Sequence, residues 1–445
     1  MRPPVSRRRR LLLIFVPVTV AIAGLSSSYI LPLDDDAIQY TKGPVDDVVS
    51  HLEQRLQSGE TRLKYEDEFG YLRSVLRELG VPQSSQVLVF SKTSFQAPRI
   101  APRTPRALYF NDNVAVGFVR TGDVLEFAAL DPKQGIMFYT LDQERTAHPH
   151  FARQDVCLQC HQGGAALGIP GLMVRSVTPD RTGMPVMSAG GFITDHRSPL
   201  KERWGGWYVT GTTGSQTHMG NAVLDGSEAE DSQDKRLPVT DGTQNVTDLS
   251  RFIDTGAYLT PHSDIVALMT LEHQTQMDNL MIRVGWEARM AMHENEAINR
   301  SLGEPADQIR ESTAHRINTA VEELLDYMLF GEETKLTAPV KGNSGFAEEF
   351  EKAGLRDGEG RSLRDFDMKT RMFRYPCSYM IYSQAFDGMP QPVKDRLYRR
   401  LWEVLTGKDS SPKFAHLSPA DRKAITGILL ATKKGLPAYW SVSQS

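Results

Sequence analysis

Apolar residues at helical spacing predict a pair of helices within residues 44–80. They recur at intervals of three and four residues, which places them on one face of a helix. Gly80 and Pro82 end the pattern, because glycine and proline are common just beyond the end of a helix. The apolar positions are Val45, Val48, Val49, Leu52 and Leu56, followed by Phe69, Leu72, Val75, Leu76 and Leu79.

Short apolar runs separated by polar turns predict β-strands over residues 86–141. Turns of the composition Asn-Asp-Asn at 111–113 and Thr-Gly-Asp at 121–123 join successive runs. This arrangement is typical of an antiparallel meander, in which each strand pairs with the next. The runs are 87–90, 108–110, 114–119, 124–127 and 136–139.

Helical spacing returns from residue 262 onward and continues to the end of the chain. Ser418 followed by Pro419 is a capped helix start. We therefore expect an α+β fold that is mainly helical, with a short antiparallel β meander in its first third. The longest amphipathic stretches are 265–284, 317–328 and 393–404.

The overall composition is that of a globular protein. The chain has 445 residues, of which 40% are hydrophobic and 24% are charged, and this excludes a disordered, collagen-like or polytopic membrane protein. Three cysteines in a chain of this length exclude a disulfide scaffold. The net charge of -4 gives no reason to expect nucleic-acid binding.

The N-terminus has the pattern of a secretory signal. Four consecutive arginines at 7–10 precede an apolar stretch at 11–25 that is short for a membrane span. Ala21-Ile22-Ala23 fits a cleavage site, although an uncleaved anchor has the same pattern. Residues 1–23 hold five arginines and no acid, so a cleaved chain would carry 46 basic and 55 acidic residues, a net charge of about −9. We expect an exported, periplasmic protein that favours basic partners.

One motif carries recognisable chemistry, the C-x-x-C-H sequence at residues 157–161. Two thiols at this spacing can attach to the two vinyl groups of one porphyrin, and the adjacent imidazole then lies beneath the iron. At these residues the chain resembles a c-type cytochrome. The resemblance implies one covalent haem c, with Cys157 and Cys160 as the thioether anchors and His161 as the proximal iron ligand. It also implies single-electron transfer in an oxidising compartment.

Other interpretations of the two cysteines remain open at this point. A C-x-x-C pair can form a redox dithiol or a simple disulfide, although the residues before Cys157 do not form a predicted strand. Zinc would need further ligands, and the chain has no second C-x-x-C motif. The five-residue match can also arise by chance.

Haem iron in an electron carrier takes a second axial ligand, usually histidine or methionine. We favour His218, which lies in a glycine-rich stretch after Trp204 and Trp207, residues suited to stacking on a flat cofactor. Met173 is the next choice. An open distal site would instead indicate a haem peroxidase or oxidase. The remaining candidates are Met184, Met187, His196, Met219, His262 and His273.

Arginines after the motif are candidates for binding the two haem propionates, because a guanidinium pairs well with a carboxylate. Of Arg175, Arg181, Arg197 and Arg203, we favour Arg197 and Arg203. The sequence has no serine-hydrolase, phosphate-loop or H-E-x-x-H motif.

Together these features predict an exported electron carrier with a basic redox partner, attached to the membrane only through a possible N-terminal anchor. The alternatives are a haem-dependent peroxidase or oxidase and an envelope protein with a C-x-x-C disulfide. We divide the chain into a signal peptide or anchor (1–25), N-terminal helices with the meander (26–145), the haem-attachment region (146–222), an acidic linker or insertion (223–248) and a helical region packing on the haem (249–445).

Overall fold

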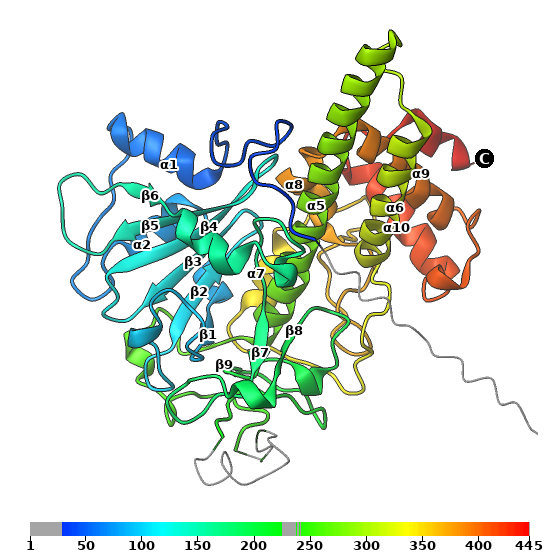
Figure 1. Cartoon of the computed structure of the whole chain (residues 1–445). Helices are drawn as coiled ribbons and strands as arrows, with labels where there is room; N and C mark the ends of the chain where they lie inside the picture. The colour runs from blue at the N-terminus through cyan, green and yellow to red at the C-terminus, as the bar shows by residue number, and fades with distance from the viewer. Residues whose placement is uncertain (1–28, 225–236, 238–239, 241, 445) are drawn as a thin grey trace, which may run out of the picture.

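An antiparallel sheet of seven strands forms one side of the molecule, in the order β6-β5-β4-β3-β2-β1-β9 (Figure 1). The computed structural model describes residues 29–224, 237, 240 and 242–444. The predicted signal segment and most of the acidic segment lie outside the described residues. The strands of the sheet are β1 (Val87–Val89), β2 (Arg106–Phe110), β3 (Val114–Val119), β4 (Val124–Asp131), β5 (Gly135–Asp142), β6 (Phe151–Arg153) and β9 (Trp207–Tyr208).

The α+β class is confirmed, but the sheet is larger than the short meander expected from the sequence. Strands β1 to β6 pair in chain order, as a meander does. The seventh strand, β9, follows the C-x-x-C-H motif in the chain and pairs with β1, with Leu88 opposite Tyr208. Two residues within a glycine-rich stretch give no alternating pattern, so this long-range pairing left no signal in the local sequence.

The two faces of the sheet have different neighbours. On one face, Phe127 lies against Phe151, and Tyr139 donates a hydrogen bond of 2.6 Å to Asp47, the residue that caps α1 (Val48–Gln57). The opposite face carries Glu126 and its cross-strand partner Gly117. Because side chains alternate along a strand, Phe138 of β5 shares this second face, and its ring centroid lies 4.9 Å from that of His161. This second face therefore meets the C-x-x-C-H motif.

Most helices belong to the C-terminal half of the chain and lie next to the sheet (Figure 1). The longest, α5, begins after the capping residue Asp264 and ends at Leu302; the next residue, Gly303, has a φ of 72°, which suits glycine. It runs between the sheet and the C-terminal helices. The helices are α1, α2 (Leu72–Glu78), α3 (Leu158–His161), α5 (Ile265–Leu302), α6 (Glu311–Met328), α7 (Phe346–Lys352), α8 (Gln384–Asp387), α9 (Gln391–Leu405) and α10 (Pro419–Thr432).

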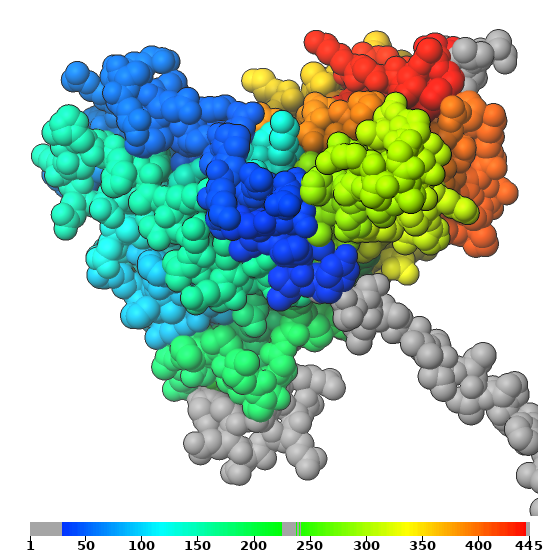
Figure 2. Space-filling model, turned by 45° about the horizontal axis from the view of Figure 1, so that its top comes forward, coloured from blue at the N-terminus to red at the C-terminus, as the bar shows by residue number. Residues whose placement is uncertain are grey.

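A second, small sheet pairs β7 (Arg175–Val177) with β8 (Gly191–Ile193). The first described residues, drawn in dark blue, lie across the junction between the sheet and the helical part (Figure 2). There Leu31 N donates to the carbonyl oxygen of Gly168, and Tyr40 donates to that of Ile136. Within the described part of the chain, no helix combines the length and apolar character needed to span a membrane.

Candidate functional site

The C-x-x-C-H motif forms one turn of helix on the sheet. A short 3-10 turn (Asp155–Cys157) leads into α3, so Cys157, Cys160 and His161 lie at positions i, i+3 and i+4, which face the same side of a helix. Neither thiol is in a disulfide; Cys157 is half-buried and Cys160 is exposed. Burial, followed by the charge of Glu126, raises the pKa of Cys157 to about 11, so this thiol is neutral at pH 7.

His161 is fixed through one of its two ring nitrogens. Its Nδ1 lies 2.9 Å from the carbonyl oxygen of Gly171, which makes Nδ1 the protonated nitrogen and leaves the Nε2 lone pair available. No described residue forms a hydrogen bond with Nε2. Burial lowers the pKa of His161, so the ring is neutral at pH 7, the form that binds a metal. Histidine ligands in proteins are typically oriented by this kind of second hydrogen bond.

The carbonyl that orients His161 is itself held by α5. Asn279 accepts a hydrogen bond from Leu172 N at 3.1 Å and donates one to Leu172 O at 2.7 Å. A Cβ atom on Gly171 would lie 2.3 Å from Asn279 Oδ1, so only glycine allows this approach. The imidazole is therefore tied to the long helix through a single short loop.

The sheet presents a charged pair to the motif. Arg106 of β2 and Glu126 of β4 form an ion pair of 2.8 Å, and their side chains are 20% and 18% exposed although they lie inside a seven-stranded sheet. After the larger effect of burial, Arg106 lowers and Glu126 raises the pKa of His161, so both charges lie near its ring. Nε of Arg106 is buried and has no described hydrogen-bond partner.

The sequence analysis missed Arg106 and Glu126. Arg106 precedes the predicted run 108–110, and Glu126 lies in the run 124–127, where a single charged residue normally marks the solvent face. Nothing in the local sequence indicates that this face meets the motif. The buried and unpartnered Nε is a donor that a carboxylate such as a haem propionate would satisfy.

Arg197 and Arg203, the predicted propionate partners, lie in a different cluster. The fully buried Arg203 pairs with Glu272 of α5 at 2.9 Å and donates to the carbonyls of His196 and Ser198. Arg197 pairs with Asp195 and lies over the ring of Tyr327. None of their described contacts is with residues 157–161.

Glu272 at the centre of this cluster has an unusual environment for a carboxylate. Burial raises the pKa of Glu272 to about 7, although Arg203 and Thr194 oppose the shift. Next to it, Nδ1 of His196 lies 2.8 Å from Nδ1 of His273, and Nε2 of His273 lies 2.8 Å from Ser378 Oγ. These contacts give both histidines structural partners.

His218, the favoured sixth ligand, is also buried away from the described contacts of the motif. Its Nδ1 accepts a hydrogen bond of 3.0 Å from Gly220 N, and its ring meets Trp204 edge to face at 5.5 Å. Burial lowers the pKa of His218 to about 4. Its role as a ligand stays a prediction, and the described contacts supply no link to His161.

The methionine candidates differ sharply in exposure. Met187, in the loop between β7 and β8, is 81% exposed, and Met184 in the same loop is about half exposed. The sulfur of Met219, by contrast, accepts a hydrogen bond from Ser176 at 3.6 Å. Exposed apolar side chains continue into β8 at Phe192 and Ile193. This loop is thus an apolar surface without a described cover.

The comparisons with known proteins give no further guidance. No family model matches the chain, and neither a curated protein nor a solved structure matches it. Among the described residues, no three His, Cys, Asp or Glu side chains are grouped so that they could hold a metal ion. The function is therefore inferred from the residues of the site.

Proposed function

We propose that this protein is an exported c-type cytochrome that transfers single electrons through one haem attached to Cys157 and Cys160, with His161 as the proximal ligand. The observation that carries the proposal is the hydrogen bond from His161 Nδ1 to Gly171 O, beside two free thiols on the same helical turn. A histidine that only fills the core has no need of an open Nε2 next to such a pair.

The surroundings of the motif also fit a haem. The chain offers an unpartnered donor at Arg106 for a propionate, and the partly buried Leu108 and Ala128 lie on the same sheet face. Arg106 replaces Arg197 and Arg203 as the propionate partner that we favour.

When bound, the haem supplies the one-electron exchange, and the protein sets its conditions. His161 is held neutral and oriented, so it can remain a ligand in both oxidation states. The ion pair of Arg106 and Glu126 places opposite charges near the site, and these adjust the potential in opposite directions. Met184 and Met187, in the loop between β7 and β8, are two exposed thioethers, and they are alternatives to His218 for the second axial position.

Export and partner preference rest on the sequence alone. The arginines at 7–10 and the apolar stretch at 11–25 support export to the periplasm, where covalent haem attachment takes place. A mature charge of about −9 favours a basic redox partner. Electron transfer to such a partner should slow as salt rises, because charges are screened over about 10 Å at 0.1 M.

Expression with a c-type maturation system tests the proposal directly. The purified protein should show a Soret band, and a denaturing gel stained for haem should show a band at the chain mass. Cys157→Ser combined with Cys160→Ser should abolish the stained band, whereas Cys377→Ser, which changes the buried third cysteine, should keep it. A colourless wild-type protein, or a stained band in the double variant, would overturn the assignment.

Reaction with hydrogen peroxide distinguishes a carrier from a peroxidase. In stopped-flow mixing, a carrier with both axial positions filled should react slowly with peroxide. Rapid formation of an oxidised haem species, followed by turnover of a reducing substrate, would instead establish the enzyme.

A further inference from the structure

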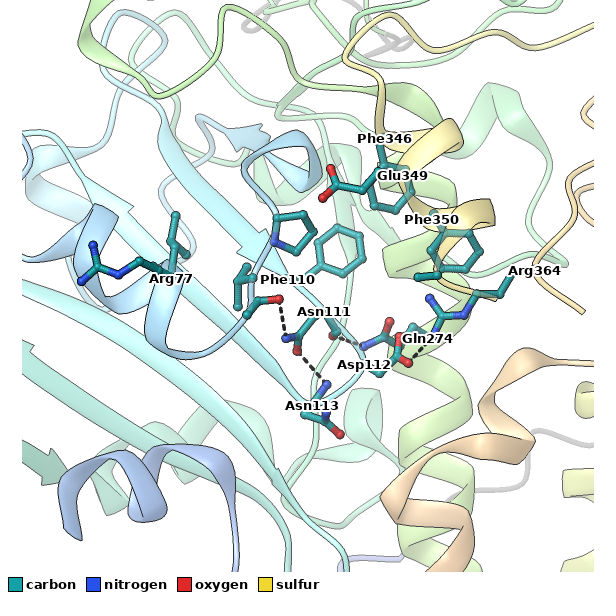
Figure 3. A pocket seen from close by; sticks show the side chains of 15 residues that line it. Arg77, Phe110, Asn111, Asp112, Asn113, Gln274, Phe346, Glu349, Phe350 and Arg364 are labelled. Atoms are coloured by element: carbon teal, nitrogen blue, oxygen red, sulfur yellow. Dashed lines mark hydrogen bonds and ion pairs between the residues drawn. The ribbon is translucent and has the colours of Figure 1, made fainter. Parts of the chain in front are cut away.

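A pocket of about 440 Å³ opens between α2, the turn joining β2 to β3, and α7 (Figure 3). This volume is within the range of small-molecule sites. Three aromatic rings line it: Phe110 and Phe346 have centroids 5.7 Å apart, and Phe346 and Phe350 lie 5.6 Å apart. Aromatic rings from separate elements, gathered around an open space, favour a flat apolar ligand.

The polar groups of the pocket are mostly paired with one another. Gln274 of α5 donates to Asn111 O at 2.7 Å and accepts from Tyr379 at 3.1 Å. Asp112 pairs with Arg364, as Figure 3 shows. With Arg77 and Glu349 also lining the pocket, two positive charges face two negative ones. The pocket therefore presents no net charge and favours a neutral ligand.

A smaller cavity lies behind Gln274. It shares Phe110, Asp112, Asn113 and Gln274 with the outer pocket, and its volume of about 10 Å³ holds roughly one water-sized group. Asp278 of α5 lines it, is only 5% exposed, and has an Oδ1 atom with no described hydrogen-bond partner. A buried acceptor of this kind is costly unless a ligand or water satisfies it.

Asp278 is suited to a neutral hydroxyl rather than to a cation. Burial, with a smaller effect from Asp112, raises the pKa of Asp278 well above its usual value and so favours the protonated, neutral form of the carboxyl group. A neutral carboxylic acid both donates and accepts a hydrogen bond, which matches a hydroxyl group.

We propose that the outer pocket and the inner cavity form one binding site for a small phenol. The aromatic ring lies against Phe110, Phe346 and Phe350, and the hydroxyl points past Gln274 into the inner cavity. There it satisfies Oδ1 of Asp278, directly or through one water. The site does not depend on a bound haem, because none of these residues belongs to the motif.

The proposal distinguishes a phenol from two close relatives. Propylbenzene lacks the hydroxyl group of para-propylphenol. It keeps the ring contacts but leaves Asp278 unsatisfied, so it should bind about tenfold more weakly than the phenol. A benzoate brings an unpaired negative charge toward a buried carboxyl and Asp112, so it should bind more weakly still.

Isothermal titration calorimetry with para-propylphenol, propylbenzene and para-propylbenzoate tests this order on the purified full chain. Ala353 lines the pocket from the exposed end of α7, so Ala353→Trp should fill the pocket and abolish phenol binding. Lys352→Trp adds the same ring at the neighbouring exposed position, which does not line the pocket, and should leave binding unchanged. Circular dichroism should show both variants folded.

Two results would overturn the proposal. One is the absence of measurable phenol binding to the wild-type chain at millimolar concentration. The other is equal binding in the Ala353→Trp and Lys352→Trp variants. As a further check, Asp278→Leu removes the acceptor, and it should reduce the preference for phenol over propylbenzene to less than twofold. A preference that persists in this variant would contradict the role of Asp278.

Discussion

His161 and Gly171 are joined by a hydrogen bond of 2.9 Å, and the backbone at Gly171 lies so close to Asn279 that no side chain fits between them. The orientation of the imidazole therefore depends on packing between a loop and α5.

Gly171→Ala should destabilise the protein by about 1–3 kcal/mol, because the added methyl group would overlap with Asn279. The double variant Gly171→Ala with Asn279→Ala should recover part of this loss, since the second change removes the obstructing amide. Urea unfolding of the single and double variants measures the coupling. Strictly additive effects would show that the two residues do not interact in this way.

Arg106→Gln should lower the reduction potential of the haem protein, and Glu126→Gln should raise it. Removing a positive charge near the iron favours the ferric state, and removing a negative charge favours the ferrous state. Spectroelectrochemical titration gives both potentials. Arg99→Gln is the control, because Arg99 pairs with Asp123 at the exposed β3–β4 turn. Shifts of the same sign in both site variants would refute this placement of the pair.

Arg203→Met should cost about 3–5 kcal/mol of stability, because it leaves Glu272 buried without its partner. Arg203→Met combined with Glu272→Leu should cost clearly less, since both charges are then gone. Urea unfolding at pH 7 tests the comparison. Covalent haem should remain in these variants if Arg203 plays no part in binding propionates. Loss of the haem would instead show that Arg203 is a propionate partner.

His218 should make stability depend on pH in acid. The unfolded chain protonates this imidazole near pH 6.5 and the folded chain only near pH 4, so its contribution is present above pH 6.5 and is lost as the pH falls toward 4. His218→Asn keeps an acceptor for Gly220 N but does not titrate. The variant should therefore lose less stability than the wild type between pH 6.5 and pH 4 in urea unfolding.

The sixth ligand can be identified from the same variants. We expect His218→Asn to keep a low-spin spectrum, because the described contacts of His218 are with Gly220 and Trp204 and not with the motif. A high-spin spectrum in Met184→Ala or Met187→Ala would identify a thioether ligand. Absorbance and electron paramagnetic resonance spectra of the ferric protein decide the point. A high-spin spectrum in His218→Asn alone would establish the histidine instead.

The regular elements were largely predictable because they depend on local spacing. The apolar repeat that begins at Ile265 predicted α5, although the helix extends to Leu302, beyond the apolar repeat and through a polar stretch that the repeat does not cover. The strands of β2 to β5 likewise matched runs of apolar residues between polar turns. The spacing of apolar residues indicates which face of a helix or strand is buried, whatever other element that face packs against.

Residues whose role depends on distant partners could not be predicted in this way. Arg203 resembled a free cation because Glu272, its partner, lies in a helix far along the chain. Arg106 stood just before a predicted strand, and Asp278 resembled an ordinary polar position on a helix. Only the assembled fold shows that the first is paired in the core and that the other two carry unsatisfied atoms.

The pairing of β9 with β1 also affects the order in which the parts of the sheet form. With the export that we propose, which begins at the N-terminus, β1 to β6 emerge first, then Cys157 and Cys160, and only later Trp207 and Tyr208, which complete the sheet. Long-range pairings of this kind form slowly. The two thiols therefore spend an interval on a chain whose sheet still has an open edge. That interval ends when β9 pairs with β1.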